Sequence, residues 1–182
     1  MKRLIDLLIS LILLLFLAIP MLGIALLIYV NDGGPVFYRQ TRIGMDCKTF
    51  SILKFRSMIL NADQVGGYQT SLNDDRITSV GKFLRRTSLD ELPQCLNVLM
   101  GHMSFVGPRP DVPAQETLYQ PEDWQKRHKV RPGFTGLAQV NGRSSISFEE
   151  RLAFDLEYVD KSSLMLDTKI ILKTLSFVAK GF

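Results

Sequence analysis

An almost uninterrupted apolar run extends from Leu7 to Val30, 24 residues in all, and it constrains the fold more than any other feature of the sequence. A helix needs about 20 apolar residues to cross the hydrocarbon core of a bilayer, so we expect a membrane helix here. A cleaved signal peptide is the alternative. The run is longer than a typical signal core and no small-residue cleavage site follows it cleanly, which favours the membrane helix.

Pro20 interrupts this run, and Gly23 follows it closely. A proline inside a helix removes one backbone hydrogen bond and clashes with the carbonyl group four residues earlier, so we predict a helix break at Pro20. The break is compatible with a bent spanning helix and with a re-entrant helix whose two ends leave the membrane on one face. Basic residues flank the run on both sides, so the positive-inside rule does not choose between them. These residues are Lys2, Arg3, Arg39, Arg42 and Lys48.

The remaining 150 or so residues are enough for one domain with its own core. The chain carries a formal net charge of +4, which is compatible with nucleic acid, anionic lipid or an anionic small molecule as partner. Two cysteines without a CxxC pair and two histidines argue against a zinc finger and a disulfide framework. The basic residues are dispersed among glycines and prolines with no helix-turn-helix pattern, so we expect no nucleic-acid partner.

The pattern beyond the membrane helix predicts a mostly helical α+β domain. Turn residues at 31–35 end the first helix, and two short runs of strand formers, 36–38 and 50–53, predict a small β-hairpin. A polar loop is expected at 63–75. Apolar residues at helical spacing predict further helices at 90–99, 124–130, 148–158 and 164–182. The last helix is basic and amphipathic, which suits a membrane interface but equally suits packing on the core.

Two adjacent acids, Asp90 and Glu91, stand in an otherwise apolar segment, with Arg85 and Arg86 about one helical turn upstream. Paired acids can hold a hard divalent cation or attack phosphorus, and arginines neutralise phosphate oxygens. Pro93 is tolerated in the first turn of a helix, so we predict that a helix begins near Asp90. Both acids would then lie at a helix N-terminus, where free N–H groups also attract anions. A solvated acid pair favoured by the helix dipole is the ordinary alternative.

Arg109 is bracketed by Pro108 and Pro110, which restrict the backbone on both sides of it. A stiff loop that presents one guanidinium group suits a phosphate clamp, because little backbone entropy remains to be lost on binding. A rigid connector with an exposed arginine is the alternative. Glycine-rich turns at 131–136 and 141–143 also carry arginines, although no nucleotide-binding fingerprint is present.

Taken in order along the chain, these segments resemble the bacterial sugar transferase family, the monotopic polyprenyl-phosphate phosphoglycosyl transferases. The resemblance covers essentially the whole chain. It is carried by Lys2-Arg3 with Asp6, QTRIG at 40–44, KFRSM at 54–58, SLDELPQ at 88–94, MSFVGPRP at 103–110 and RPGFTGLAQVNGR at 131–143. Any one of these motifs could arise by chance, but all of them in this order make coincidence very improbable.

The resemblance implies transfer of a sugar 1-phosphate from a UDP-sugar to polyprenyl (undecaprenyl) phosphate, giving UMP and a polyprenyl diphosphate sugar at the start of bacterial surface glycan assembly. It implies that Asp90 attacks the sugar-side phosphorus to form an aspartyl phosphosugar intermediate, and that Asp90 and Glu91 hold Mg²⁺. Other residues are implied to bind substrate and phosphate. They are Arg109 as the clamp, then Arg85, Lys54, Arg56 and Asp155.

The resemblance also implies a re-entrant membrane helix over residues 1–32, broken at Pro20, and a catalytic domain over 33–182 with amphipathic interfacial helices. That domain would contact membrane lipids at the cytoplasmic face of the bacterial inner membrane. Two positions depart from the family pattern: Ile19 stands where a serine often precedes the proline, and His102 stands where an aspartate is common. A metal-dependent pyrophosphatase and an inactive scaffold for glycosyltransferases are the alternatives. The sugar transferred and a homodimer are left open.

Overall fold

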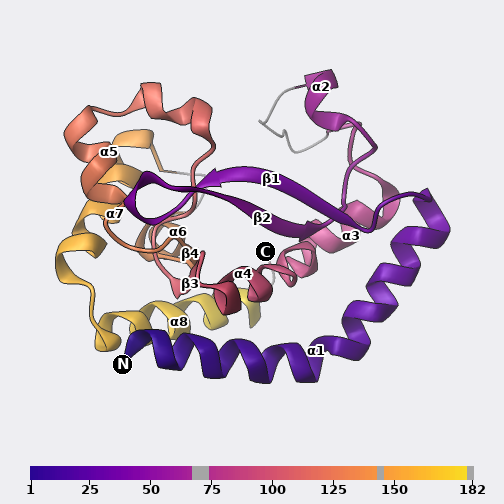
Figure 1. Cartoon of the computed structure of the whole chain (residues 1–182), viewed down its shortest axis with the longest axis horizontal. Coiled ribbons are helices and arrows are strands. Elements are labelled where there is room, and N and C mark those ends of the chain that lie inside the picture. Colours follow the sequence, from indigo (N-terminus) through magenta and orange to yellow (C-terminus); the bar gives the residue numbers. More distant parts are fainter. Residues whose placement is uncertain (67–73, 143–145, 180–182) are drawn as a thin grey trace.

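Helix α1 (Lys2–Asp32) runs along one edge of the molecule and bends near its middle (Figure 1). In the computed structural model, which describes residues 1–66, 74–142 and 146–179, α1 is one continuous helix of 31 residues with Pro20 inside it. Proline is a usual cause of sharp helix bends, so the predicted break takes the form of a bend. Within the described residues, α1 is the single helix long and apolar enough to cross a membrane. Phe16 and Ile19 are about 80% exposed, at 80% and 82%.

The predicted hairpin is confirmed. Strand β1 (Phe37–Ile43) pairs antiparallel with β2 (Thr49–Phe55), and both strands are longer than the sequence pattern indicated. A 3₁₀ turn at Met45–Cys47 joins them, with Asp46 in the left-handed region at φ 56°. The hairpin crosses the whole molecule, so its two ends contact different groups of helices (Figure 1).

Further helices, five of them no longer than eight residues, follow along the described chain. They are α2 (Ala62–Gly66), α3 (Ser79–Arg86), α4 (Gln94–Met100), α5 (Pro121–Arg127), α6 (Leu137–Asn141), α7 (Phe148–Lys161) and α8 (Leu164–Ala179). Side-chain caps fix two starts: Thr78 accepts a hydrogen bond from the Gly81 N–H, and Ser147 forms a capping box with Glu150.

Three helix boundaries differ from the sequence prediction, and one of them is the end of α7, which extends past the expected residue 158 to Lys161. The helix expected to start near Asp90 begins at Gln94, because residues 89–91 form a 3₁₀ turn and Pro93 occupies the N-cap of α4. The helix tail expected at 124–130 ends at Arg127. Parts of the predicted polar loop (67–73), Arg143 and the end of the last helix (180–182) lie outside the described residues.

A parallel strand pair, β3 (Ser104–Val106) with β4 (Gly133–Thr135), was not anticipated from the sequence. Two glycines allow the close approach of their backbones. A Cβ on Gly107 would lie 2.3 Å from the Arg131 carbonyl oxygen, and one on Gly133 would lie 2.1 Å from the Gly107 nitrogen. Any side chain at either position would therefore separate the two segments.

The core consists of several small apolar clusters instead of one large centre. Helix α4 lies between the hairpin and α1, so Val98 and Met103 pack on Phe50 and Ile52 (Figure 1). The other clusters centre on the buried residues Tyr158 with Ile170, Phe55 with Leu84, and Trp124 with Ile43.

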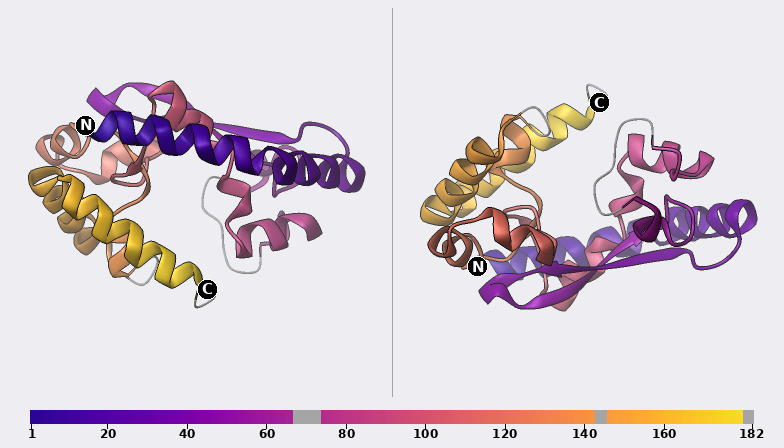
Figure 2. Two further views of the ribbon diagram at one scale, coloured as in Figure 1. Left: turned by 90° about the horizontal axis from the view of Figure 1, so that it is seen from below. Right: turned by 90° about the horizontal axis from the view of Figure 1, so that it is seen from above.

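Both ends of α1 are attached to this domain. At the N-terminal end, Lys2 Nζ lies 2.6 Å from Asp167 Oδ2, and Arg3 donates to the Val98 carbonyl oxygen at 2.7 Å. Seen from below and from above, α8 starts beside this end of α1 and diverges from it (Figure 2). Near the C-terminal end, Ile28 is fully buried against Phe55 of β2 and α3. One compact domain therefore holds the helix at both ends.

Candidate active site

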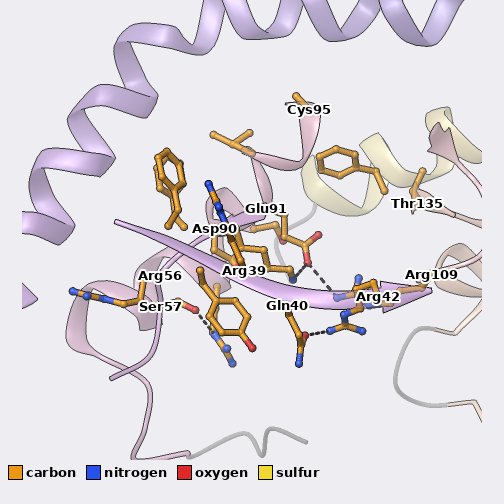
Figure 3. A pocket seen from close by; sticks show the side chains of 18 of the residues that line it. Arg39, Gln40, Arg42, Arg56, Ser57, Asp90, Glu91, Cys95, Arg109 and Thr135 are labelled. Carbon is orange, nitrogen blue, oxygen red and sulfur yellow. Dashed lines mark hydrogen bonds and ion pairs between the residues drawn. The ribbon is translucent and has the colours of Figure 1, made fainter. Parts of the chain in front are cut away.

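A cavity of about 1320 Å³ opens beneath the hairpin, and it has two chemically different walls. The polar wall carries Asp90 and Glu91 together with Lys54 of β2 and arginines from β1, from α3 and from the segment that follows β2 (Figure 3). The opposite wall is apolar and comes mainly from α1 and α8, with one side chain from β3. Its side chains include Ile9, Leu13, Leu17, Phe105, Ile171 and Leu175. The cavity can therefore receive a ligand that is strongly anionic at one side and apolar at the other.

The acids lie on a tight turn between α3 and α4. Ser88 adopts the left-handed conformation at φ 56°, and the 3₁₀ turn Leu89–Glu91 follows it directly. This turn presents Asp90, which is 6% exposed, on the cavity wall next to Glu91. The predicted acid pair therefore lines the cavity. The two acids lie on the 3₁₀ turn that precedes α4 and not in the first turn of that helix, where they were expected.

Glu91 is held by two cations. Lys54 Nζ on β2 lies 2.6 Å from Glu91 Oε1, and Arg109 Nη2 lies 3.2 Å from the same oxygen. Although burial opposes ionisation, these cations lower the pKa of Glu91 to about 2. Burial lowers the pKa of Lys54 and outweighs the opposing pull of Glu91. Glu91 is thus ionised at neutral pH and fixes Lys54 and Arg109 in place.

Asp90 has a different environment. Burial raises its pKa, and the nearby charges of Lys54, Arg85 and Arg109 only partly offset that effect. Within the described part of the chain, no side chain forms a hydrogen bond or ion pair with the Asp90 carboxylate. Its oxygens are therefore available to a ligand in the cavity, unlike those of Glu91.

Two further predicted arginines occupy one end of the cavity. Arg85 Nε donates to Ser57 Oγ at 2.8 Å, and Arg56 donates to the Gly33 carbonyl oxygen. The Nε and Nη1 atoms of Arg56 are buried and have no hydrogen-bond partner among the described residues. Arg86, by contrast, is exposed and does not line the cavity. In Figure 3, Asp90 and Glu91 lie between this end, marked by Arg56 and Ser57, and the end marked by Arg109 and Thr135.

The loop that carries Arg109 is held by a buried and a half-buried arginine that the sequence did not single out as site residues. Arg127 Nη2 donates to the Arg109 carbonyl oxygen at 2.7 Å, and Arg42 Nη1 donates to the Pro110 carbonyl oxygen at 2.9 Å. Arg127 also pairs with Asp111. The sequence could have identified Arg42 as a site residue, because it belongs to the QTRIG motif. Arg127 looked like an ordinary charge in the last turn of a helix.

The remaining predicted residue, Asp155 on α7, also lines the cavity. Its Oδ2 atom lies 2.8 Å from Arg127 Nη2, while its Oδ1 atom is buried and has no hydrogen-bond partner in the part of the chain that the structure describes. Burial raises the pKa of Asp155, and Arg127 opposes that shift. The structure thus brings the predicted catalytic and substrate-binding residues to one cavity, with Asp155 next to the arginine that holds the Arg109 loop, while Pro20 does not line it.

The two departures from the family pattern both lie away from the cavity. The ring of His102 stacks on Phe50 with centroids 5.6 Å apart, and neither residue lines the cavity. Ile19 is 82% exposed on the outer side of α1. Neither side chain therefore contacts the acid pair.

Comparison with known proteins gives a consistent picture. The family model described as bacterial sugar transferase matches residues 1–181. The UDP-glucose:undecaprenyl-phosphate glucose-1-phosphate transferase of Escherichia coli (strain K12) is 45% identical over 189 residues, covering 100% of this chain and 40% of the relative. The exopolysaccharide production protein PSS of Rhizobium leguminosarum bv. phaseoli is 45% identical over 186 residues, covering 96% of this chain and 93% of the relative.

A third relative, the transferase of Caulobacter vibrioides with the same name as the Escherichia coli protein, is 41% identical over 181 residues, covering 96% of this chain and 68% of the relative. Coverage differs widely among these proteins. The chain spans about two fifths of the length of its Escherichia coli and Klebsiella pneumoniae relatives.

Proposed function

The chain belongs to the bacterial sugar transferase family, and on that premise we propose that it transfers a sugar 1-phosphate from a UDP-sugar to undecaprenyl phosphate. One observation carries the proposal: a single cavity joins a wall of acids and arginines to an apolar wall built partly from the membrane helix. The first wall suits a diphosphate, and the second suits a prenyl chain. Relatives named as glucose-1-phosphate transferases that act on undecaprenyl phosphate support the same substrates.

In the proposed reaction, a carboxylate oxygen of Asp90 attacks the sugar-side phosphorus of the donor. The bond from that phosphorus to the bridging oxygen breaks, and UMP leaves with the electron pair. An oxygen of undecaprenyl phosphate then attacks the phosphosugar on Asp90 and releases the free carboxylate. Splitting the displacement in this way replaces one difficult step with two easier ones. The unpaired and buried carboxylate of Asp90 supports its role as nucleophile.

Glu91, Lys54 and Arg109 have supporting roles in this proposal. Glu91 fixes the two cations at one of its carboxylate oxygens, where both can face the anionic donor. Arg109 is the stronger candidate for a phosphate clamp, because its side chain is half exposed at 50% and can turn toward a ligand. Arg85 and Arg56 lie at the far end, where they suit the phosphate of the departing nucleotide.

The residues also fit a Mg²⁺ ion that arrives with the donor. Asp90 and Glu91 offer adjacent hard oxygen ligands, and the described residues contain no group of three or more His, Cys, Asp or Glu side chains that could hold a metal. Mg²⁺ is commonly bound by one or two carboxylates together with substrate phosphates and water. When bound, the ion would offset the charge of the diphosphate.

We further propose that α1 is a re-entrant helix, with the domain of residues 33–182 at the cytoplasmic face of the inner membrane. Its 31 residues would span about 46 Å if straight, which exceeds the hydrocarbon core of a bilayer. A straight crossing would place its two ends on opposite faces. Instead the helix is bent, and Lys2 and Ile28 are both attached to the same domain, which supports re-entry.

The direct test is UMP release by the purified chain from a panel of UDP-sugars, with Mg²⁺ and with or without undecaprenyl phosphate. We expect UMP to form in step with an undecaprenyl diphosphate sugar and to be lost on chelation. The Asp90→Asn variant serves as control and should release none. Hydrolysis of the donor that is independent of undecaprenyl phosphate would indicate a pyrophosphatase instead. Glycan assembly that persists in cells carrying Asp90→Asn would indicate a scaffold.

A further inference from the structure

Helices α6 and α7 contribute polar side chains to the cavity that the proposed chemistry does not use. Gln139 lies on α6, and Arg151 and Asp155 lie one turn apart on α7. Residues three or four apart share one face of a helix, so Arg151 and Asp155 present their side chains together. Helix α6 follows β4, whose Thr135 lies at the Arg109 end of the cavity (Figure 3).

These three residues carry an unusual number of unsatisfied polar atoms. Both Nε2 and Oε1 of Gln139, Oδ1 of Asp155 and Nε of Arg151 are buried and form no hydrogen bond with the described residues. Asp155 as a whole is only 1% exposed. Buried polar atoms in proteins nearly always have partners, and each unmet one costs free energy. A group of them on the wall of one cavity indicates a ligand that supplies both donors and acceptors.

We propose that Gln139 and Asp155 form a subsite that binds the hydroxyl groups of the sugar carried by the nucleotide donor. The proposal rests on the transferase function proposed above. A sugar hydroxyl both donates and accepts, which matches the amide of Gln139 and the free oxygen of Asp155. Because Arg127 neutralises Asp155, the subsite is suited to an uncharged group.

The position of the subsite agrees with the direction of the reaction. Asp155 pairs with Arg127, and Arg127 holds the Arg109 carbonyl, so the subsite adjoins the proposed phosphate clamp. Arg56 and Arg85 lie at the other end of the cavity, beyond the acid pair, and suit the anionic nucleotide that leaves. A donor in this orientation has its sugar near Gln139 and its two phosphates across Asp90.

The experiment compares Gln139→Leu with the matched control Gln64→Leu, both in an Asp90→Asn background that separates binding from reaction. Gln64, on α2, lines the same cavity, but α2 lies apart from α6 and α7 (Figure 1). Calorimetry measures the affinity of the full chain for UDP and for UDP-glucose, UDP-galactose and UDP-N-acetylglucosamine with Mg²⁺. Loss of one or two hydrogen bonds predicts about a tenfold weaker binding of the preferred UDP-sugar by Gln139→Leu.

Binding of UDP should stay within about twofold in that variant, since UDP lacks the sugar, and Gln64→Leu should change neither affinity. The melting temperature of Gln139→Leu should not fall, because neither polar atom of Gln139 bonds to the described protein. If leucine disturbs packing, Gln139→Met gives the same comparison with a flexible side chain. Unchanged UDP-sugar affinity, or an equal loss for UDP and UDP-sugar, overturns the subsite. Affinity is measured without turnover, whereas the transferase proposal is tested by UMP release. A failure of the subsite is therefore distinguishable from a failure of the transferase proposal.

Discussion

Removal of the Arg127 side chain should damage both stability and activity. Arg127 is 2% exposed and pairs with two buried carboxylates, those of Asp111 and Asp155. The substitution Arg127→Met keeps most of the apolar stem but leaves both acids unpaired in the interior. Breaking a buried ion pair in this way costs about 3–5 kcal/mol. For a chain of this size the corresponding fall in melting temperature is about 10 °C.

The neighbouring residue provides a matched control. Lys126 forms an ion pair with Asp160 at 2.8 Å, but both side chains are about half exposed, at 41% and 56%. Exposed pairs contribute about 0–1 kcal/mol, so Lys126→Met should melt within about 3 °C of the wild type. Trp124 is the single tryptophan and is buried one turn before Arg127, so its intrinsic fluorescence reports the unfolding of this region.

A double variant separates charge from packing. Adding Asp155→Asn to Arg127→Met removes one of the two orphaned charges and should recover part of the lost stability. Activity should not return, because the hydrogen bond that holds the Arg109 carbonyl is still missing. If Arg127→Met melts as high as Lys126→Met, the buried network does not stabilise the domain and our reasoning is wrong.

Three further predictions concern the acid pair and helix α1. Arg109→Ala should raise the KM for the UDP-sugar and lower kcat, with a combined loss of about 10- to 100-fold in steady-state assays; normal kinetics would exclude the clamp role. The folded-state pKa of Glu91 is about 2 and its ordinary value is 4.5, so its ionisation contributes about 3 kcal/mol that is fully present above pH 4.5 and is lost as pH falls through 2. The difference in unfolding free energy between wild type and Glu91→Gln should therefore shrink on acidification, and a pH-independent difference would contradict the assignment. Single cysteines at Met1 and Asn31, with Cys47 and Cys95 replaced by serine, should both react with a cytoplasmic thiol reagent if α1 is re-entrant, whereas labelling from opposite sides would mean that it spans.

The parts of the site that could be predicted from the sequence are those encoded by neighbouring residues. The adjacency of Asp90 and Glu91, and the prolines around Arg109, are local and indicated both groups directly. Pro20 likewise predicted the bend in α1, and strand formers around a short turn predicted the hairpin. The start of helix α4 could not be predicted in this way. The 3₁₀ turn that carries the acids depends on the left-handed backbone conformation of Ser88, which the residue type does not indicate.

Long-range pairing could not be predicted in the same way. Strands β3 and β4 are three residues each and lie almost thirty positions apart, so no local periodicity reveals that they pair. The roles of Arg127 and Gln139 depend on side chains brought together from different helices. A buried arginine and a buried glutamine look, in sequence, like surface residues. The attachment of Lys2 to Asp167 is hidden for the same reason.

The glycine contact between the Arg109 loop and β4 has a consequence for protein engineering. The Gly107 N–H donates to the Thr135 carbonyl at 2.9 Å, and the Gly133 N–H donates to the Pro108 carbonyl at 2.9 Å. These bonds involve main-chain atoms only, so the pairing of the two segments does not depend on most of their side chains. We therefore expect that residues 101–142 can be transferred between relatives as one unit. Chimaeras between relatives should exchange that unit whole, and libraries that seek a new donor should vary position 139 while both glycines stay constant.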